Sequence, residues 1–109
     1  MITPLTYDIL LALADADRHG YGIIKEIEAR QGAGAAPSTG ALYLALQRME
    51  RDGLVVEART GADDGEDARR RYYRLTRTGR AAATAESRRL AGLVDIARSK
   101  KLLTRRVDA

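Results

Sequence analysis

The chain of 109 residues has no cysteine, no tryptophan and no phenylalanine, and it has a single histidine. Without cysteine it can form neither disulfides nor thiolate metal sites, and His19 alone cannot build a metal site. The residues therefore predict no metal and no cofactor. Because the aromatic residues are limited to five tyrosines, the core must come mainly from Leu, Ile, Val and Ala. Chains with such small cores often gain buried area by dimerising.

Long apolar runs are also missing from the sequence. No segment approaches the roughly 20 apolar residues of a membrane span, and no signal-peptide pattern opens the chain. We therefore expect a single-domain cytoplasmic protein without membrane contact. The sequence also contains no Ser-His-Asp set, no paired-carboxylate pattern and no phosphate-loop motif. An enzyme is therefore not expected.

The net charge of +4 is modest, but the charges are unevenly distributed. Residues 1–17 contain three aspartates and no basic residue, whereas residues 69–80 contain six arginines and no acidic residue. Such a concentration of arginine indicates a surface for phosphate groups. A solvated charge run is the general alternative. The tyrosines that interleave with these arginines favour nucleic acid.

Two helices are predicted in the first third of the chain. Thr3 can cap a helix that starts at Pro4, because proline at the first helical position gives up no needed donor. After a connection over 15–20, a second helix is predicted from about Tyr21 to Gln31, with isoleucines turned inward. We interpret His19, which precedes a glycine at the start of this helix, as a capping or packing residue.

The segment Ser38 to Gly53 predicts a third helix with a capped start and a glycine stop. Its inward stripe at helical spacing consists of Leu42, Ala45, Leu46 and Met49. The opposite face carries Gly40, Leu44, Gln47, Arg48 and Arg51, with Tyr43 at the boundary. The helix thus has one apolar face for the core and an opposite face with amide, guanidinium and small apolar groups. This pattern is typical of a helix that enters a DNA major groove.

The rest of the chain predicts a hairpin and a long helix. Residues 54–59 and 70–76 alternate as two strands, joined by a polar loop over 60–68 that holds two glycines and four acids. Thr76 then caps a final helix whose apolar stripe is too long for so small a domain to cover, so we infer that it packs on a partner chain. The fold class is therefore α+β, mainly α: a winged helix-turn-helix (three helices and a two-stranded wing) over 1–76, with a dimerisation helix over 77–109.

Three ordered groups of residues resemble the PadR family of bacterial transcriptional regulators. They are His19-Gly20-Tyr21-Gly22-Ile23, then Gly40-Ala41-Leu42-Tyr43 with Leu46, Met49-Glu50 and Gly53-Leu54, and last Arg71-Tyr72-Tyr73-Arg74-Leu75-Thr76 followed by Gly79-Arg80. The short C-terminal part is similar to the subfamily that ends after one dimerisation helix. The resemblance implies a homodimeric repressor on a roughly palindromic operator, often released by a small molecule.

The chain departs from the family at two places. It has Leu44 where the family usually has proline, and its wing tip over 61–67 is strongly acidic. Because carboxylates are repelled by phosphates, we expect the arginines of the returning strand, rather than this tip, to contact the DNA backbone.

The predicted partner is double-stranded DNA, and the candidate contacts lie on three elements. Backbone amides at the start of the third helix favour a phosphate, and Arg and Gln are the side chains that read guanine and adenine. The predicted DNA-binding residues are Tyr21, Lys25, Ser38, Thr39, Gly40, Tyr43, Leu44, Gln47, Arg48, Arg69, Arg70, Arg71 and Arg74. Ser38 and Thr39 can equally serve as an ordinary helix cap, and Tyr43 as a packing residue.

A homodimer interface is predicted between the first and last helices, where a small hydrophobic effector would also bind. Its candidate residues are Leu5, Ile9, Leu90, Leu93, Val94, Ile96 and Ala97, which can equally form a plain dimer core. Two other functions stay open from the residues: a winged-helix module that docks acidic proteins, and a small-molecule sensor or carrier that uses the dimer cavity.

Overall fold

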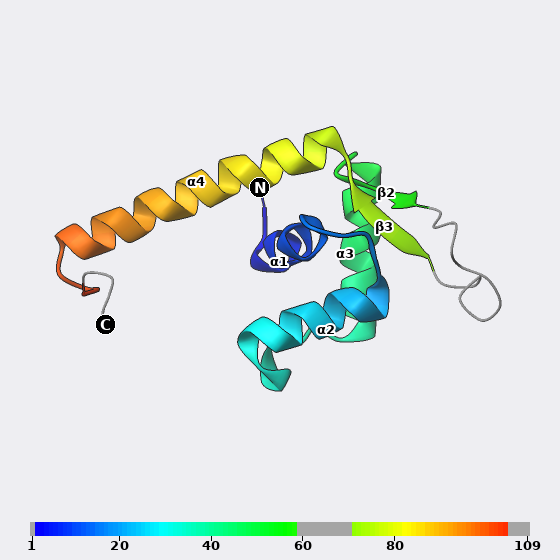
Figure 1. The fold of residues 1–109 in the computed structure, drawn as a ribbon, viewed down its shortest axis with the longest axis horizontal. Coiled ribbons are helices and arrows are strands. Elements are labelled where there is room, and N and C mark those ends of the chain that lie inside the picture. Colours follow the sequence, from blue (N-terminus) through cyan, green and yellow to red (C-terminus); the bar gives the residue numbers. More distant parts are fainter. Residues whose placement is uncertain (1, 59–70, 105–109) are drawn as a thin grey trace.

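The computed structural model describes residues 2–58 and 71–104. In chain order these residues form α1 (Pro4–Leu13), β1 (Arg18–His19), α2 (Gly20–Gln31), the short 3-10 helix η1 (Ala33–Ala35), α3 (Thr39–Arg51), β2 (Val55–Ala58), β3 (Tyr72–Leu75) and α4 (Arg77–Ser99). Helices α1, α2 and α3 form a compact group beside a small sheet, and α4 runs over this group (Figure 1). The mainly helical winged fold is thus confirmed. Among the described helices, none has the length and apolar character needed to span a membrane.

Each α-helix begins at a side chain that accepts a hydrogen bond from its first turn. Thr3 accepts from Thr6, His19 Nδ1 from the Gly22 amide, Ser38 from Ala41 and Thr76 from Gly79. These contacts satisfy amides that have no partner within the helix. The caps predicted at Thr3 and Thr76 are confirmed, and so is the capping role of His19.

The core lies where α1, α2 and α3 meet the sheet. Fully buried side chains come from every one of these elements and have the spacing that amphipathic helices require: Ile9, Leu10, Ile23, Ile27, Leu42, Leu46, Met49 and Val55. The inward stripe predicted for α3 is therefore confirmed. Burying it fixes the opposite face of α3 toward solvent.

The sheet has three strands among the described residues, where the sequence predicted two. Its order is β1-β3-β2 and all pairs are antiparallel. Strand β1 pairs Arg18 with Tyr73 and His19 with Tyr72, and the His19 ring meets the Tyr72 ring edge-on, with 5.1 Å between centroids. The extra strand ties the start of α2 to the wing. The loop expected over 60–68 lies outside the described residues.

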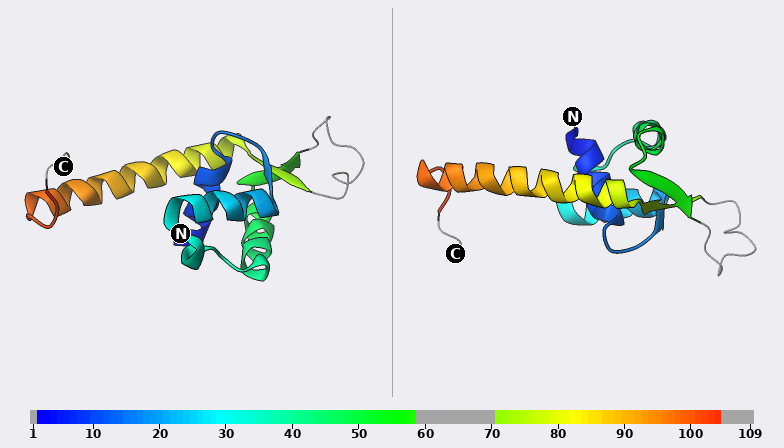
Figure 2. Two further views of the ribbon diagram at one scale, coloured as in Figure 1. Left: turned by 60° about the horizontal axis from the view of Figure 1, so that its bottom comes forward. Right: turned by 90° about the horizontal axis from the view of Figure 1, so that it is seen from above.

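Helix α4 leaves the body of the protein over much of its length. Its first turns pack near α1 and β3, whereas its second half projects beyond the rest of the chain (Figure 1 and Figure 2). The apolar side chains there are exposed, with Leu93 at 49% and Ile96 at 51%. The molecule is consequently elongated, with extents of 53 × 28 × 24 Å.

The helix ends at Ser99, earlier than the dimerisation helix that the sequence predicted over 77–109. Lys101 adopts a left-handed conformation (φ 65°), and the amides of Lys101 and Leu102 bond the carbonyls of Arg98 and Ala97. This Schellman arrangement closes the helix at Ser99. Helix α3 ends in the same way at Arg51, with Gly53 (φ 78°) as the left-handed residue, and this is the glycine stop that the sequence predicted.

Candidate nucleic-acid interface

The outer face of α3 is a line of four residues, Gly40, Leu44, Gln47 and Arg51. Their spacing of four, three and four places them on one side of a helix, directly opposite the buried stripe. All four are exposed. The helix therefore presents one backbone surface, one aliphatic group, one amide and one guanidinium in succession. We call these four residues the α3 outer face.

The polar side chains near this face are free to bind. Within residues 2–58 and 71–104, Gln47, Arg48 and Arg51 form no side-chain hydrogen bond and no ion pair. Side chains that have no partner in the protein lose no internal bond when they bind a ligand. Arg51 was not among the predicted contacts, although its position eleven residues after Gly40 could have identified it.

Tyr43 lies beside the α3 outer face and packs against the start of α2. A Cβ built on Gly20 would collide with the hydroxyl and with Cζ of Tyr43. Tyr43 nevertheless stays 42% exposed. The packing role weighed for Tyr43 is therefore real, and it holds the hydroxyl at the edge of α2. Sequence reasoning noted Gly20 only as part of a motif and missed this contact.

Two predicted phosphate ligands on α2 already interact with each other. The Lys25 ammonium lies 5.6 Å from the centre of the Tyr21 ring and 3.4 Å from a Glu28 carboxylate oxygen. Tyr21 first, and then Glu28, raise the pKa of Lys25. Both candidate side chains are exposed, Tyr21 at 63%. They are accessible to a phosphate, although Glu28 offsets part of the charge of Lys25.

The wing arginines that the structure describes are paired with carboxylates. Arg74 donates three hydrogen bonds to the Asp17 carboxylate, the shortest at 2.8 Å, and this pairing raises its pKa. Arg71 lies 3.4 Å from Glu57 on the neighbouring strand. Arg74 is therefore not the free cation that the sequence suggested, because Asp17, which sequence reasoning did not single out, holds it. Arg69 and Arg70 lie outside the described residues.

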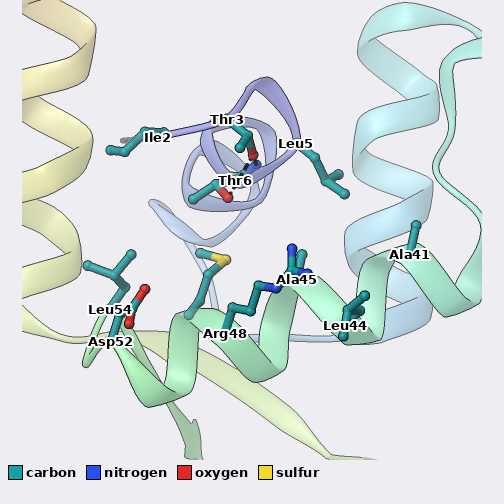
Figure 3. Close-up of a pocket in the computed structure, with 11 residues that line it drawn as sticks. Ile2, Thr3, Leu5, Thr6, Ala41, Leu44, Ala45, Arg48, Asp52 and Leu54 are labelled. Carbon is teal, nitrogen blue, oxygen red and sulfur yellow. Dashed lines mark hydrogen bonds between the residues drawn. The ribbon is translucent and has the colours of Figure 1, made fainter.

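A groove of about 580 Å³ separates α3 from the start of α1 (Figure 3). Leu44 and Arg48 line its α3 side, and Ile2 and Leu5 line its α1 side. Leu5, a predicted interface residue, therefore lies in this groove between helices of one chain.

The predicted dimer and effector residues do not all lie on one surface. Ile9 is fully buried in the core of the single chain, so its assignment to an interface is wrong. The sequence pattern showed that Ile9 faces inward but could not show that α2 and α3 already cover it. Leu93, Val94 and Ile96 are exposed on α4, while Leu90 and Ala97 are half-buried.

A second groove, of about 360 Å³, does lie between α1 and α4, but its lining differs from the prediction. Its residues are Leu11, Ala14, Arg80, Ala83, Thr84, Ser87, Arg88 and Ala91. Tyr7 and Ser87 share a hydrogen bond of 2.6 Å beside it. Among the described residues, no cluster of three or more potential ligands could hold a metal ion.

Comparison with known proteins agrees with this geometry. Residues 9–85 match the family described as "Transcriptional regulator PadR-like family". The chain is 40% identical over 82 residues to the transcriptional regulator Rv3488 of Mycobacterium tuberculosis, covering 75% of this chain and 71% of that protein.

Two solved structures extend the comparison to three dimensions. A PadR family transcription regulator from Clostridium difficile has a TM-score of 0.71 and 27% identity, covering 85% of this chain and 95% of that one. Bacillus subtilis PadR in complex with operator DNA has a TM-score of 0.65 and 22% identity, covering 76% of this chain and 46% of that one. Because its identity is only 22%, the similarity to the Bacillus subtilis protein concerns the fold alone.

Proposed function

Because the chain belongs to the PadR-like family of transcriptional regulators, we propose that it is a repressor that binds a palindromic DNA operator as a homodimer. The α3 outer face carries this proposal. It combines exposure, a straight line of residues along one helix, and polar side chains without internal partners. These are the properties required of a helix that reads base edges in a major groove.

Contacts to the DNA backbone would surround this face. At the start of α3, Thr39 and the backbone amides that Ser38 does not cap would bind one phosphate. A neighbouring phosphate would be bound by three side chains of the adjoining surface, Tyr21, Lys25 and Tyr43. In the wing, Arg69, Arg70 and Arg71 supply attraction that does not depend on base sequence. The chromosome is the site of such binding, so the protein would act in the cytoplasm.

The homodimer would form through α4. The exposed apolar side chains Leu93, Val94 and Ile96 lie on the half of α4 that no other described element covers. A contiguous apolar surface of this kind is a common site of association between subunits. Residues 1–76 would then be the DNA-binding unit and residues 77–109 the dimerisation unit of one compact protomer.

A small hydrophobic effector would bind near this interface. The groove between α1 and α4 has an apolar floor that includes Leu11, Ala83 and Ala91. It borders the helix on which the partner would pack. A ligand held there would change how α1 sits on α4 and, through the dimer, the distance between the two α3 helices. Release from the operator would follow from that change.

A gel shift on DNA from the protein's own promoter region tests the proposed function. We expect a shifted complex that weakens with salt, since phosphate neutralisation releases counterions. The double variant Gln47→Ala/Arg51→Ala should lose the complex. The control Lys100→Ala also removes one positive charge, but at the far end of α4, and should keep it. Equal loss in both variants would argue against recognition by α3.

A further inference from the structure

Leu44 is an aliphatic side chain in the middle of a surface that is otherwise suited to hydrogen bonding. It is 49% exposed and lies between Gly40 and Gln47 on the α3 outer face. A single exposed leucine is ordinary on protein surfaces. Here, however, it occupies the second turn of the helix, where side chains of a groove-reading helix reach base edges.

The surroundings of Leu44 leave it accessible from outside the protein. One turn before it, nothing lies within 4 Å of a Cβ built on Gly40. No side chain there keeps a DNA strand away from Leu44. On its inner side, Leu44 borders the groove against α1 that also contains Leu5 and Ile2. The leucine is thus half-exposed and available to a ligand.

The major groove offers one apolar group, the C5-methyl of thymine. Cytosine has a hydrogen at that position, and the purines present polar atoms. We infer that Leu44 reads a thymine methyl in each half-site of the operator. This inference rests on the proposed function, because it requires α3 to lie in the major groove. It adds that the leucine selects thymine over cytosine at one defined position.

The test uses a duplex selected by the protein from a random DNA pool. Each thymine of one half-site is replaced in turn by deoxyuridine, which removes only the methyl group. At one position we expect the affinity to fall about four-fold, the value for one buried methyl-sized group. Replacement in both half-sites should lower it about 15-fold, if the two contacts add.

Three variants assign the effect to Leu44. Leu44→Ala should bind the thymine and deoxyuridine duplexes equally. Leu44→Met keeps an aliphatic chain and should retain the discrimination. Gln47→Ala, one turn along the same face, should bind more weakly overall and still discriminate between thymine and deoxyuridine at the Leu44 position.

Two outcomes would overturn the inference. In one, no thymine in the half-site is sensitive to loss of its methyl group. In the other, Leu44→Ala discriminates as well as the unmodified protein. Both outcomes presuppose that the protein binds the selected duplex. Failure to select any duplex would instead contradict the proposed function, so the two failures are distinguishable.

Discussion

The phenol end of Tyr43 on α3 occupies the space that a side chain on Gly20, at the start of α2, would fill. Gly20 is buried and Tyr43 is partly exposed. The two residues come from separate motifs that both supported the family resemblance. Their contact shows that these motifs meet in space and set how α2 and α3 lie relative to each other.

Substituting Gly20 should therefore both destabilise the protein and weaken DNA binding. We expect Gly20→Ala to lower the free energy of unfolding by about 1–3 kcal/mol, the usual cost of overpacking. Urea unfolding measures this change. In the background Tyr43→Ala, the same substitution should cost little, because the collision is gone. Gly40→Ala is the control, since that position has open space and alanine favours helices. A similar loss for Gly20→Ala in both backgrounds would contradict the contact.

The wing arginines should differ in their effect on the salt dependence of binding. Removing one phosphate-binding arginine should reduce the slope of log K against log salt by about one unit. We expect this for Arg70→Ala and Arg71→Ala. Arg74→Ala should change the slope less, because three hydrogen bonds to the Asp17 carboxylate hold that guanidinium. Arg71 is also paired, but only through one 3.4 Å contact with Glu57, and its side chain is more exposed than that of Arg74. Fluorescence anisotropy at several salt concentrations measures the slopes. Unchanged slopes for Arg70→Ala and Arg71→Ala would remove these residues from the DNA interface.

The stability of the fold should decrease in alkaline solution through Tyr73. Burial raises the pKa of this phenol above its usual value of 10.0. The folded protein thus holds the proton more tightly than the unfolded chain. The contribution of Tyr73 is complete below pH 10.0 and is lost as the pH rises through the folded-state pKa.

Thermal unfolding between about pH 8 and pH 11 checks this prediction, because this range includes the ordinary tyrosine pKa of roughly 10. The melting temperature of the unmodified protein should fall more steeply at the alkaline end than that of Tyr73→Phe. Tyr21→Phe serves as the control, because Tyr21 is exposed. Parallel curves for all three proteins would show that Tyr73 does not carry the effect.

A charge placed on the exposed half of α4 should separate the proposed dimer. Leu93→Glu and Ile96→Glu each put a carboxylate on a surface that two chains would bury, and an unpaired buried charge is costly. For Leu93→Glu and for Ile96→Glu, sedimentation or light scattering should report the mass of one chain. Val56→Glu alters an apolar residue of similar exposure on β2, distant from this surface, and should remain dimeric. Dimers in all three variants would exclude this face as the interface.

Local signals in the sequence predicted the helices well, because caps and apolar spacing act over a few residues. Ser38 and the Leu42–Met49 stripe define α3 without help from the rest of the chain. Gly53 marks the end of α3 because glycine is the usual left-handed residue there. At the end of α4, Lys101 is the residue that adopts the left-handed conformation. A lysine carries no such signal, so the helix was expected to run further.

The features that the sequence did not reveal depend on long-range contacts. Strand β1 has two residues and therefore no periodicity; it exists because β3 provides a partner. Asp17 and Arg74 are 57 residues apart, and only the sheet brings them together. The outward line on α3 was predictable from spacing alone. Which of its polar groups are free became visible only with the neighbouring elements in place.

In the proposed complex, two copies of α3 read two inverted half-sites on one face of DNA. Hydroxyl-radical footprinting on a selected duplex measures where the two copies of α3 lie on the DNA. We expect two equivalent protected regions whose centres are separated by one helical turn of about 10–10.5 base pairs, or by a multiple of it. A single protected half-site, or a separation between these multiples, would contradict it.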